Sequence, residues 1–316
     1  MCANANHLRR QQVLAAAIVL VLANSAARAG DANLALAAGV RSGDAAAVAA
    51  AIDAGAEIDR AGLSGDTPLM RAAGTGRVRA AQVLLDKGAK RELRNADGDT
   101  PLLLAARACA GGVVRVLVAA GADAMATDPT QATALMLAAN RCSDSALKPL
   151  LTAPKLIDAL DQRGWTALWH AVDRNNVQAV TALLSAGADL RLAPPGEPDP
   201  LRHAIERGAS VVAMLLIQHG AAADKPDDAG VTPLMLAARM GDAQMIGQLL
   251  NAGADADRRG KLGQTALMIA AAAGRADAVA ALLAGRADKT LRDKRKETAL
   301  DIAKAAGSED VARRLE

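Results

Sequence analysis

Apolar residues recur along the chain at helical spacing, in short stretches that polar residues and glycines interrupt. Leu69 and the pair Ala72-Ala73 lie three and four positions apart, which places them on one face of a predicted helix. A second apolar stretch ends in Leu84-Leu85, and Gly76 lies between the two stretches. Glycine favours the left-handed conformation that closes a helix. The pattern therefore predicts two short helices joined by a tight turn.

This helix-pair pattern returns every 33 residues without an insertion or a deletion. The motif Thr67-Pro68-Leu69 opens one copy, and a looser copy from Leu36 to Ile58 precedes it. Later copies open at Thr100, Thr133, Thr166, Asp199, Thr232, Thr265 and Thr298. One helix pair cannot bury its apolar face alone, but a stack of pairs can. We therefore expect one all-α solenoid over residues 30–316, with about nine stacked helix-turn-helix repeats of which the first and last act as caps.

Each recurring residue has a local structural role. The threonine, or Asp199, is a predicted N-cap whose side-chain oxygen accepts a backbone N–H, and proline suits the first helical position. The alanine pair allows neighbouring helices to approach closely. A polar turn such as Asn95-Ala96-Asp97-Gly98 then leads to the next cap.

These residues resemble the ankyrin repeat family, whose T-P-L-H-x-A-A…G…LL…GAD pattern is matched almost throughout residues 31–316. The resemblance implies a curved stack of antiparallel helix pairs with turns that project like fingers. It also implies binding through the finger tips and the inner helix surface. The histidine of the family's pattern is replaced by Met70, Leu103, Met136, Trp169, Arg202, Met235, Met268 and Asp301. We expect weaker hydrogen bonding at the apolar ones, and less regular turns where Pro154 and Arg286 replace a glycine.

Composition agrees with thin helix packing. Hydrophobic residues make up 52% of the chain and charged residues 22%, with no Phe or Tyr and only two tryptophans, Trp165 and Trp169. A core of small aliphatic residues suits repeated helix pairs better than a thick globular interior.

The first 29 residues have the pattern of a cleavable secretory signal. His7, Arg9 and Arg10 precede an apolar stretch from Val13 to Ala23, and Ala27-Arg28-Ala29 forms an A-x-A cleavage site. The apolar stretch is short compared with the about 20 residues that span a bilayer. We expect export to the periplasm or beyond and no stable membrane insertion after cleavage; the alternative is an uncleaved anchor.

The net charge of +3 comes entirely from this segment. Without its three arginines the chain has as many basic as acidic side chains, 34 of each kind. A neutral chain with almost no aromatic residues is a poor match for nucleic acid, which needs clustered cations or stacking rings. We therefore expect no nucleic-acid partner.

Two cysteines remain after cleavage, Cys109 and Cys142, at the same position of consecutive repeats. Most other copies have glycine there, so both repeats give up a favourable turn residue. In an oxidising compartment this pairing predicts a disulfide. Stacked helices are about 8–10 Å apart and bridged Cα atoms about 4.4–6.8 Å, so the two turns must lean together. Two inert buried thiols are the alternative.

Catalytic and metal-binding patterns are absent from the sequence. His170, His203 and His219 lack the spacing of a zinc site, and no G-x-S-x-G motif occurs. We expect no cofactor and no enzymatic activity. A hydrolase that uses scattered carboxylates is a remaining alternative, as is a secreted effector that acts on another cell.

The candidate partner site follows from the resemblance. Its residues are Arg107, Arg141, Arg174, Arg207, Arg239 and Trp165. Arg141, Arg174 and Arg207 are successive copies of one position and should form a row; we call them the arginine row. Arginine binds carboxylates well and tryptophan is a favoured interface anchor, although Asp173 and Glu206 could instead neutralise the row. We expect a monomer that binds another protein, such as an envelope enzyme or a toxin.

Overall fold

The computed structural model describes residues 28–316, which form helices joined by loops. Within this range, one isolated bridge between Thr127 and Thr133 is the sole β pairing, so the all-α prediction is confirmed. The predicted signal over residues 1–29 lies outside the described residues, apart from Arg28 and Ala29.

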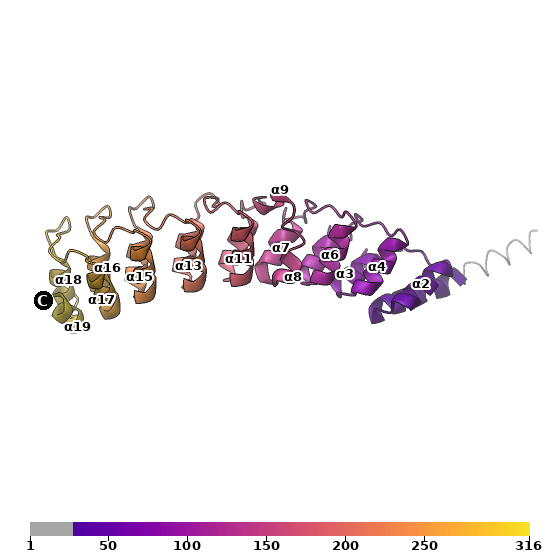
Figure 1. Ribbon diagram of the computed structural model, residues 1–316, viewed down its shortest axis with the longest axis horizontal. Coiled ribbons are helices and arrows are strands. Elements are labelled where there is room, and N and C mark those ends of the chain that lie inside the picture. Colours follow the sequence, from indigo (N-terminus) through magenta and orange to yellow (C-terminus); the bar gives the residue numbers. More distant parts are fainter. Residues whose placement is uncertain (1–27) are drawn as a thin grey trace, which may run out of the picture. The chain divides into compact units, whose positions relative to one another are not determined.

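The chain divides into two compact units. The first unit contains residues 28–138 together with Cys142–Leu156. Residues 28–42 are helical, and the helices that follow are α2 (Ala45–Asp53), α3 (Pro68–Gly74), α4 (Val78–Asp86), α5 (Pro101–Arg107), α6 (Gly111–Ala119), α7 (Ala134–Arg141), α8 (Asp144–Leu147) and α9 (Pro154–Ile157). Within this unit α3 packs against α5, and α4 packs against α2 and α6 (Figure 1).

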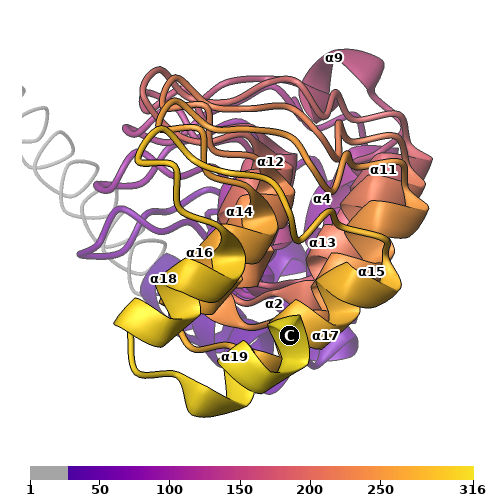
Figure 2. The ribbon, with the colours of Figure 1, turned by 90° about the vertical axis from the view of Figure 1, so that its left-hand side faces the viewer.

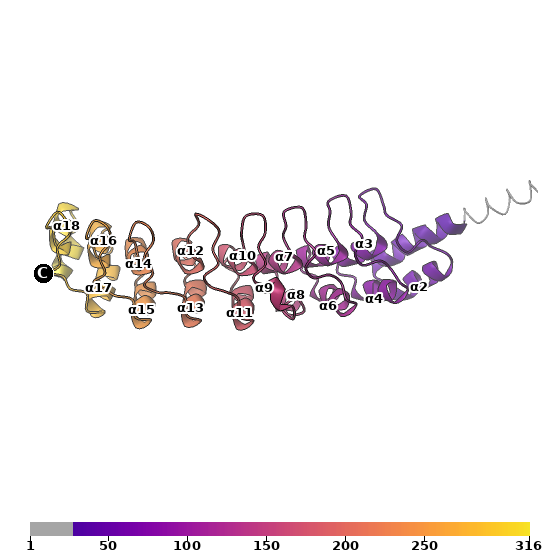
Figure 3. The same ribbon diagram turned by 90° about the horizontal axis from the view of Figure 1, so that it is seen from above.

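The second unit contains Ala139–Arg141 together with Ile157–Glu316. Its further helices are α10 (Ala167–Asp173), α11 (Val177–Ser185), α12 (Pro200–Glu206), α13 (Ser210–Gln218), α14 (Pro233–Met240), α15 (Ala243–Asn251), α16 (Ala266–Ala272), α17 (Ala276–Ala284), α18 (Ala299–Ala305) and α19 (Glu309–Leu315). First helices such as α14 and α16 form one layer, second helices such as α15 and α17 form another, and loops project from one edge (Figure 2). Figure 3 shows these two layers of the second unit from above.

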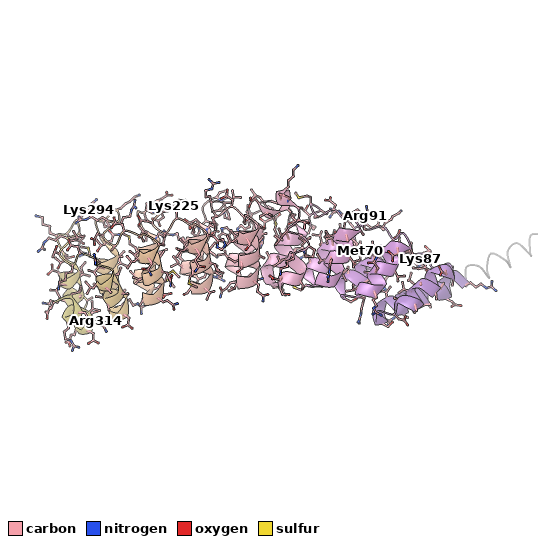
Figure 4. The ribbon with its side chains drawn as sticks, viewed as in Figure 1. Met70, Lys87, Arg91, Lys225, Lys294 and Arg314 are labelled. Carbon is pink, nitrogen blue, oxygen red and sulfur yellow. A yellow bond between two sulfur atoms is a disulfide. The ribbon has the colours of Figure 1, made fainter. Side chains whose placement is uncertain are left out.

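The threonine caps of the first helices are present as predicted. Thr67 Oγ1 accepts the Met70 backbone N–H at 3.2 Å, and the Met70 sulfur accepts the Thr67 backbone N–H at 3.3 Å. Met136, Met235 and Met268 repeat this reciprocal pair. Methionine at this position thus accepts a backbone hydrogen bond within its own repeat, and the bond is weak because a thioether is a weak acceptor. Figure 4 shows Met70 within the helical part of the first unit.

Small aliphatic side chains fill the space between the helices. Ala72 and Ala73 are 0% exposed, as are Ala237 and Ala238 in the same positions of a later repeat. Trp169, 1% exposed, is the largest of the fully buried side chains. The alanine pairs therefore lie in the core between the helices, on the face that the repeat pattern predicted to be buried.

The repeat over residues 127–159 is irregular. Its second helix, α8, has four residues, and Pro149 follows in a turn. Pro154 begins the short helix α9, which lies on the side where the loops project (Figure 2). The expectation of an irregular turn at Pro154 is thus confirmed, whereas Arg286 adopts a left-handed φ of 64° and takes over the role of glycine.

Candidate binding surface

The loops that project between one repeat and the next are called fingers below. In four fingers an aspartate at the same repeat position holds the tip, a role that was not predicted from the sequence. Asp161 Oδ1 accepts the backbone N–H groups of Arg163 at 2.8 Å and of Trp165 at 2.9 Å. The same two-bond arrangement is made by Asp128, Asp227 and Asp293. These aspartates recur at the 33-residue period, which is the signal that would have identified them.

The second carboxylate oxygen of three tip aspartates binds a cationic or imidazole group. Arg107 contacts Asp128 at 2.5 Å, His170 contacts Asp161 at 3.0 Å, and Arg202 contacts Asp227 at 2.8 Å. These three partners come from different positions of the repeat. The fingers are thereby anchored to first helices, of the same repeat for Asp161 and of the preceding repeat for Asp128 and Asp227, and present their tips in a fixed orientation.

Arg107 is engaged in this anchoring within the first unit. Its guanidinium also contacts Asp99 at 3.2 Å, and both carboxylates are nearly buried. Burial acts to raise the pKa of Asp128, but hydrogen bonds from Thr130 and Ala132, together with Arg107, outweigh it and lower that pKa. At Asp99 burial dominates over Arg107 and raises the pKa.

Two arginines of the row line a pocket in the second unit. The pocket has a volume of about 410 Å³ and is lined by Asn140, Arg141, Arg174 and Asn176. Asn176 is held in place by hydrogen bonds to the Ala139 carbonyl and the Ala179 backbone N–H. Arg141 is exposed, and the Arg174 side chain is 59% exposed.

Asp173 is the acidic residue closest to the arginine row. Arg174 Nε lies 3.7 Å from one Asp173 oxygen, and Arg207 Nη2 lies 4.0 Å from the other. Arg207 also donates to the Asp173 backbone carbonyl at 3.3 Å. These are long contacts between exposed guanidinium groups and one carboxylate, so they stabilise the protein little.

Arg239, at the end of α14, is exposed, and its carbonyl accepts a hydrogen bond from Arg275 at 3.3 Å. Its guanidinium has no ion-pair partner within residues 28–316. It occupies the repeat position of Arg107 and not that of the arginine row.

Trp165 lies in a group of four rings. Its ring centroid is 4.4 Å from that of Trp169 and 5.1 Å from that of His170, while Trp169 is 4.2 Å from His203. The Arg163 guanidinium lies over the Trp165 ring at 5.1 Å. Trp169 is buried and packs in the core, whereas Trp165 stays partly exposed at its finger. Only Trp165 can therefore contact a partner.

The two histidines of this group each face an aspartate. Burial lowers the pKa of His170, and the Asp161 carboxylate opposes this effect without cancelling it. His203 lies 3.2 Å from Asp173. Sequence reasoning placed both histidines as parts of the scaffold, and these contacts agree with that interpretation.

Cys109 and Cys142 form a disulfide in the first unit, with their Cα atoms 5.2 Å apart. The two turns thus lean together, as the pairing required. Cys109 keeps the left-handed conformation of the glycine it replaces, with φ 54°. Cys142 is instead extended, with φ −88° and ψ 160°, so only one of the two repeats gives up the usual turn.

No group of three or more metal-ligating side chains occurs in the described part of the chain. Among the same residues, no helix has the length and apolar character needed to cross a bilayer.

Comparison with known families agrees with this geometry. A family described as ankyrin repeats (3 copies) matches residues 34–128, 107–194 and 191–260, and one described as ankyrin repeats (many copies) matches residues 249–303. The chain belongs to the ankyrin repeat family. Ankyrin repeat proteins are non-catalytic binding scaffolds, so this one is a protein–protein interaction module and not an enzyme. No curated protein matches the chain significantly.

Proposed function

We propose that this ankyrin repeat protein is exported and binds an acidic region of a partner protein through the arginine row and the finger tips. The pocket between Arg141 and Arg174 carries the proposal. A guanidinium donates two parallel hydrogen bonds to a carboxylate, and the Asn140 amide beside it can add a further hydrogen bond to an acidic side chain.

The charge of this region favours an acidic partner. Asp173 is shared by Arg174 and Arg207 through long contacts, which leaves the row with more positive than negative charge. Arg141 adds a further exposed guanidinium. Association with an acidic surface would replace weak internal contacts with closer ones.

Trp165 supplies a second contact on the same unit. Its partly exposed ring is held by the neighbouring rings and by the Asp161 turn, so binding orders few side chains. Rigid tryptophan and arginine side chains are frequent hot spots of protein interfaces. We therefore include Trp165 in the partner site.

Export is supported by the N-terminal pattern and by the disulfide. A basic start, an apolar stretch and an A-x-A site precede Gly30. A disulfide between Cys109 and Cys142 suits an oxidising compartment such as the periplasm. N-terminal sequencing of the protein recovered from the envelope tests this part, and a mature chain that still begins at Met1 would contradict it.

The partner site is tested by affinity capture from the envelope fraction of the source cell. The bait is the tagged protein, beside a variant in which Arg141, Arg174 and Arg207 are changed to glutamate. A matched control carries the same charge change on exposed arginines of second helices, namely Arg79, Arg115 and Arg313. We expect one protein to be retained by the parent and by the control and lost by the arginine-row variant.

Equal capture by all three baits, with the same thermal unfolding profile, would contradict the arginine-row site. If the envelope supplies no partner, the protein and its partner are sought in the culture medium. Recovery there would favour the alternative of a secreted effector.

A further inference from the structure

The last two fingers differ in charge from those before them in the second unit. The finger over residues 222–231 contains Asp224, Asp227 and Asp228 against Lys225. The last finger, residues 288–297, reverses this balance with Lys289, Arg292, Lys294, Arg295 and Lys296 against three acidic side chains. The finger before it, residues 255–264, adds Arg258, Arg259 and Lys261 against Asp255 and Asp257. A nearly neutral chain thus concentrates positive charge at one place.

Some of these cations are engaged within the protein. Arg258 pairs with Asp224, and Arg295 lies 3.5 Å from Glu297. Arg292 lies 3.8 Å from Asp301, and Lys289 donates to the Leu315 carbonyl at 2.8 Å. The contacts to Asp301 and Leu315 hold the last finger against α18 and α19.

Four other cations remain unpaired, and we call them the basic finger edge. They are Arg259, Lys261, Lys294 and Lys296. All four are exposed, and none has an ion-pair partner among residues 28–316. The aspartates nearby accept hydrogen bonds from backbone amides: Asp257 from Asp288, and Asp293 from Arg295 and Glu297. The four cationic side chains therefore face solvent, whereas the Asp257 and Asp293 carboxylates accept hydrogen bonds from finger backbone amides.

A backbone hydrogen bond places the two finger tips next to each other. The Lys294 N–H donates to the Leu262 carbonyl at 3.1 Å. Gly263 makes this approach possible, because a Cβ there would lie 3.1 Å from the Lys294 nitrogen and its φ is 77°. Figure 4 shows Lys294 at the edge where the loops project. The unpaired cations of the two fingers therefore lie at adjacent tips, on the edge of the second unit from which the loops project.

Leu262 adds an apolar group to this edge. Leu262 is 69% exposed, so most of this residue faces solvent at the finger tip. It lies directly beside Lys261 in the sequence and beside Lys294 through the backbone hydrogen bond. The tip thus combines a protruding leucine with unpaired cations.

We propose that the basic finger edge docks on an anionic phospholipid surface. Exposed lysines and arginines bind the headgroup layer additively, and a protruding leucine can enter the boundary between headgroups and acyl chains. An acidic protein fits less well, because lysine is depleted from protein interfaces and no aromatic anchor is present in these two fingers. Single-stranded nucleic acid fits less well for lack of stacking rings.

Vesicle flotation of the full chain tests the proposal. We expect binding to vesicles of phosphatidylcholine and phosphatidylglycerol in equal amounts, and none to phosphatidylcholine alone. Lys294→Gln should weaken binding about five-fold, the effect of one surface cation. Lys225→Gln, on the acidic finger at the same loop edge, is the matched control and should change binding less than about two-fold.

The leucine has its own pair of variants. Leu262→Ser should weaken binding to the anionic vesicles, whereas Leu160→Ser, at a finger position 53% exposed in the same unit, should not. Circular dichroism of each variant checks that the fold is retained. Because the arginine row is unchanged in all of these proteins, the result does not depend on the proposed partner site.

Three outcomes would overturn the proposal. One is equal binding to neutral and anionic vesicles, and another is an equal loss of binding for Lys294→Gln and Lys225→Gln. The third is no binding to anionic vesicles while an acidic peptide or a DNA duplex binds with the Lys294 dependence, which would assign the edge to another class of polyanion.

Discussion

The repeats that contain α7–α9 and α14–α15 have the same first helix and different second helices. Thr133 and Thr232 cap their helices alike, each accepting the backbone N–H of a methionine three residues later, Met136 or Met235. After α14, Gly241 turns the chain with φ 85° and Asp242 caps the nine-residue helix α15. After α7, the extended Cys142 leads to the four-residue helix α8, whose N-cap Ser143 makes no capping hydrogen bond.

The difference shows that the two helices of a repeat depend on different residues. The first helix needs only its threonine cap and apolar face, and both repeats have them. The second helix follows a left-handed turn residue, and nine-residue second helices such as α4 and α6 form behind such a turn even without a side-chain cap. The repeat of α7–α9 lacks this left-handed turn. The disulfide to Cys109 supplies a covalent connection in the repeat where the left-handed turn is missing.

Removing the disulfide should have the largest effect. Cys109→Ser/Cys142→Ser is expected to lower the free energy of unfolding by about 3–4 kcal/mol, because a loop of 33 residues is no longer closed in the unfolded chain. Urea unfolding with and without reductant measures the loss. Reductant should shift the parent by the same amount and leave the double variant unchanged. An intact mass that corresponds to two free thiols under non-reducing conditions would contradict the prediction.

Truncating matched leucines should come next. Leu249 and Leu150 occupy the same repeat position and are 0% and 1% exposed, respectively. Leu249→Ala is expected to destabilise the protein by about 3 kcal/mol, because α15 holds the cavity open, and Leu150→Ala by about 2 kcal/mol, because the non-helical backbone can collapse around it. Urea unfolding of the two variants decides between them, and a larger loss for Leu150→Ala would contradict this account.

Removing the caps of the second helices should have the smallest effect. Asp242 and Ser143 also occupy the same repeat position, and Asp242 accepts the Met245 N–H at 2.9 Å. Asp242→Ala should destabilise the protein by about 1 kcal/mol, and Ser143→Ala by less than about 0.5 kcal/mol. Thermal unfolding measures both. Equal losses would show that Ser143 caps α8 after all.

The sequence predicted the helix pairs well because their causes are local. A first helix begins at Thr67 and Pro68 and ends before Gly76, and equivalent residues recur every 33 positions in most repeats. The disulfide was also predictable, since two cysteines share one position of adjacent repeats.

The anchoring of the fingers was not predicted, because it depends on contacts between different repeat positions. Arg107 was expected to face a partner, yet it binds Asp99 and Asp128. The unpaired state of Lys294 depends equally on where nearby carboxylates point. Neither can be read from spacing alone.

The position of the disulfide also limits how the gene can change length. Removing 33 consecutive codons leaves caps and apolar positions in phase, because every repeat has the same length. Cys109 and Cys142 are themselves 33 residues apart, so any such deletion that begins within residues 77–142 removes one of them and never both. The shortened chain would carry one unpaired thiol, able to join two chains together. Repeats after Cys142 can be lost or duplicated without this penalty, so the disulfide fixes the copy number of one part of the array and leaves the other free to vary.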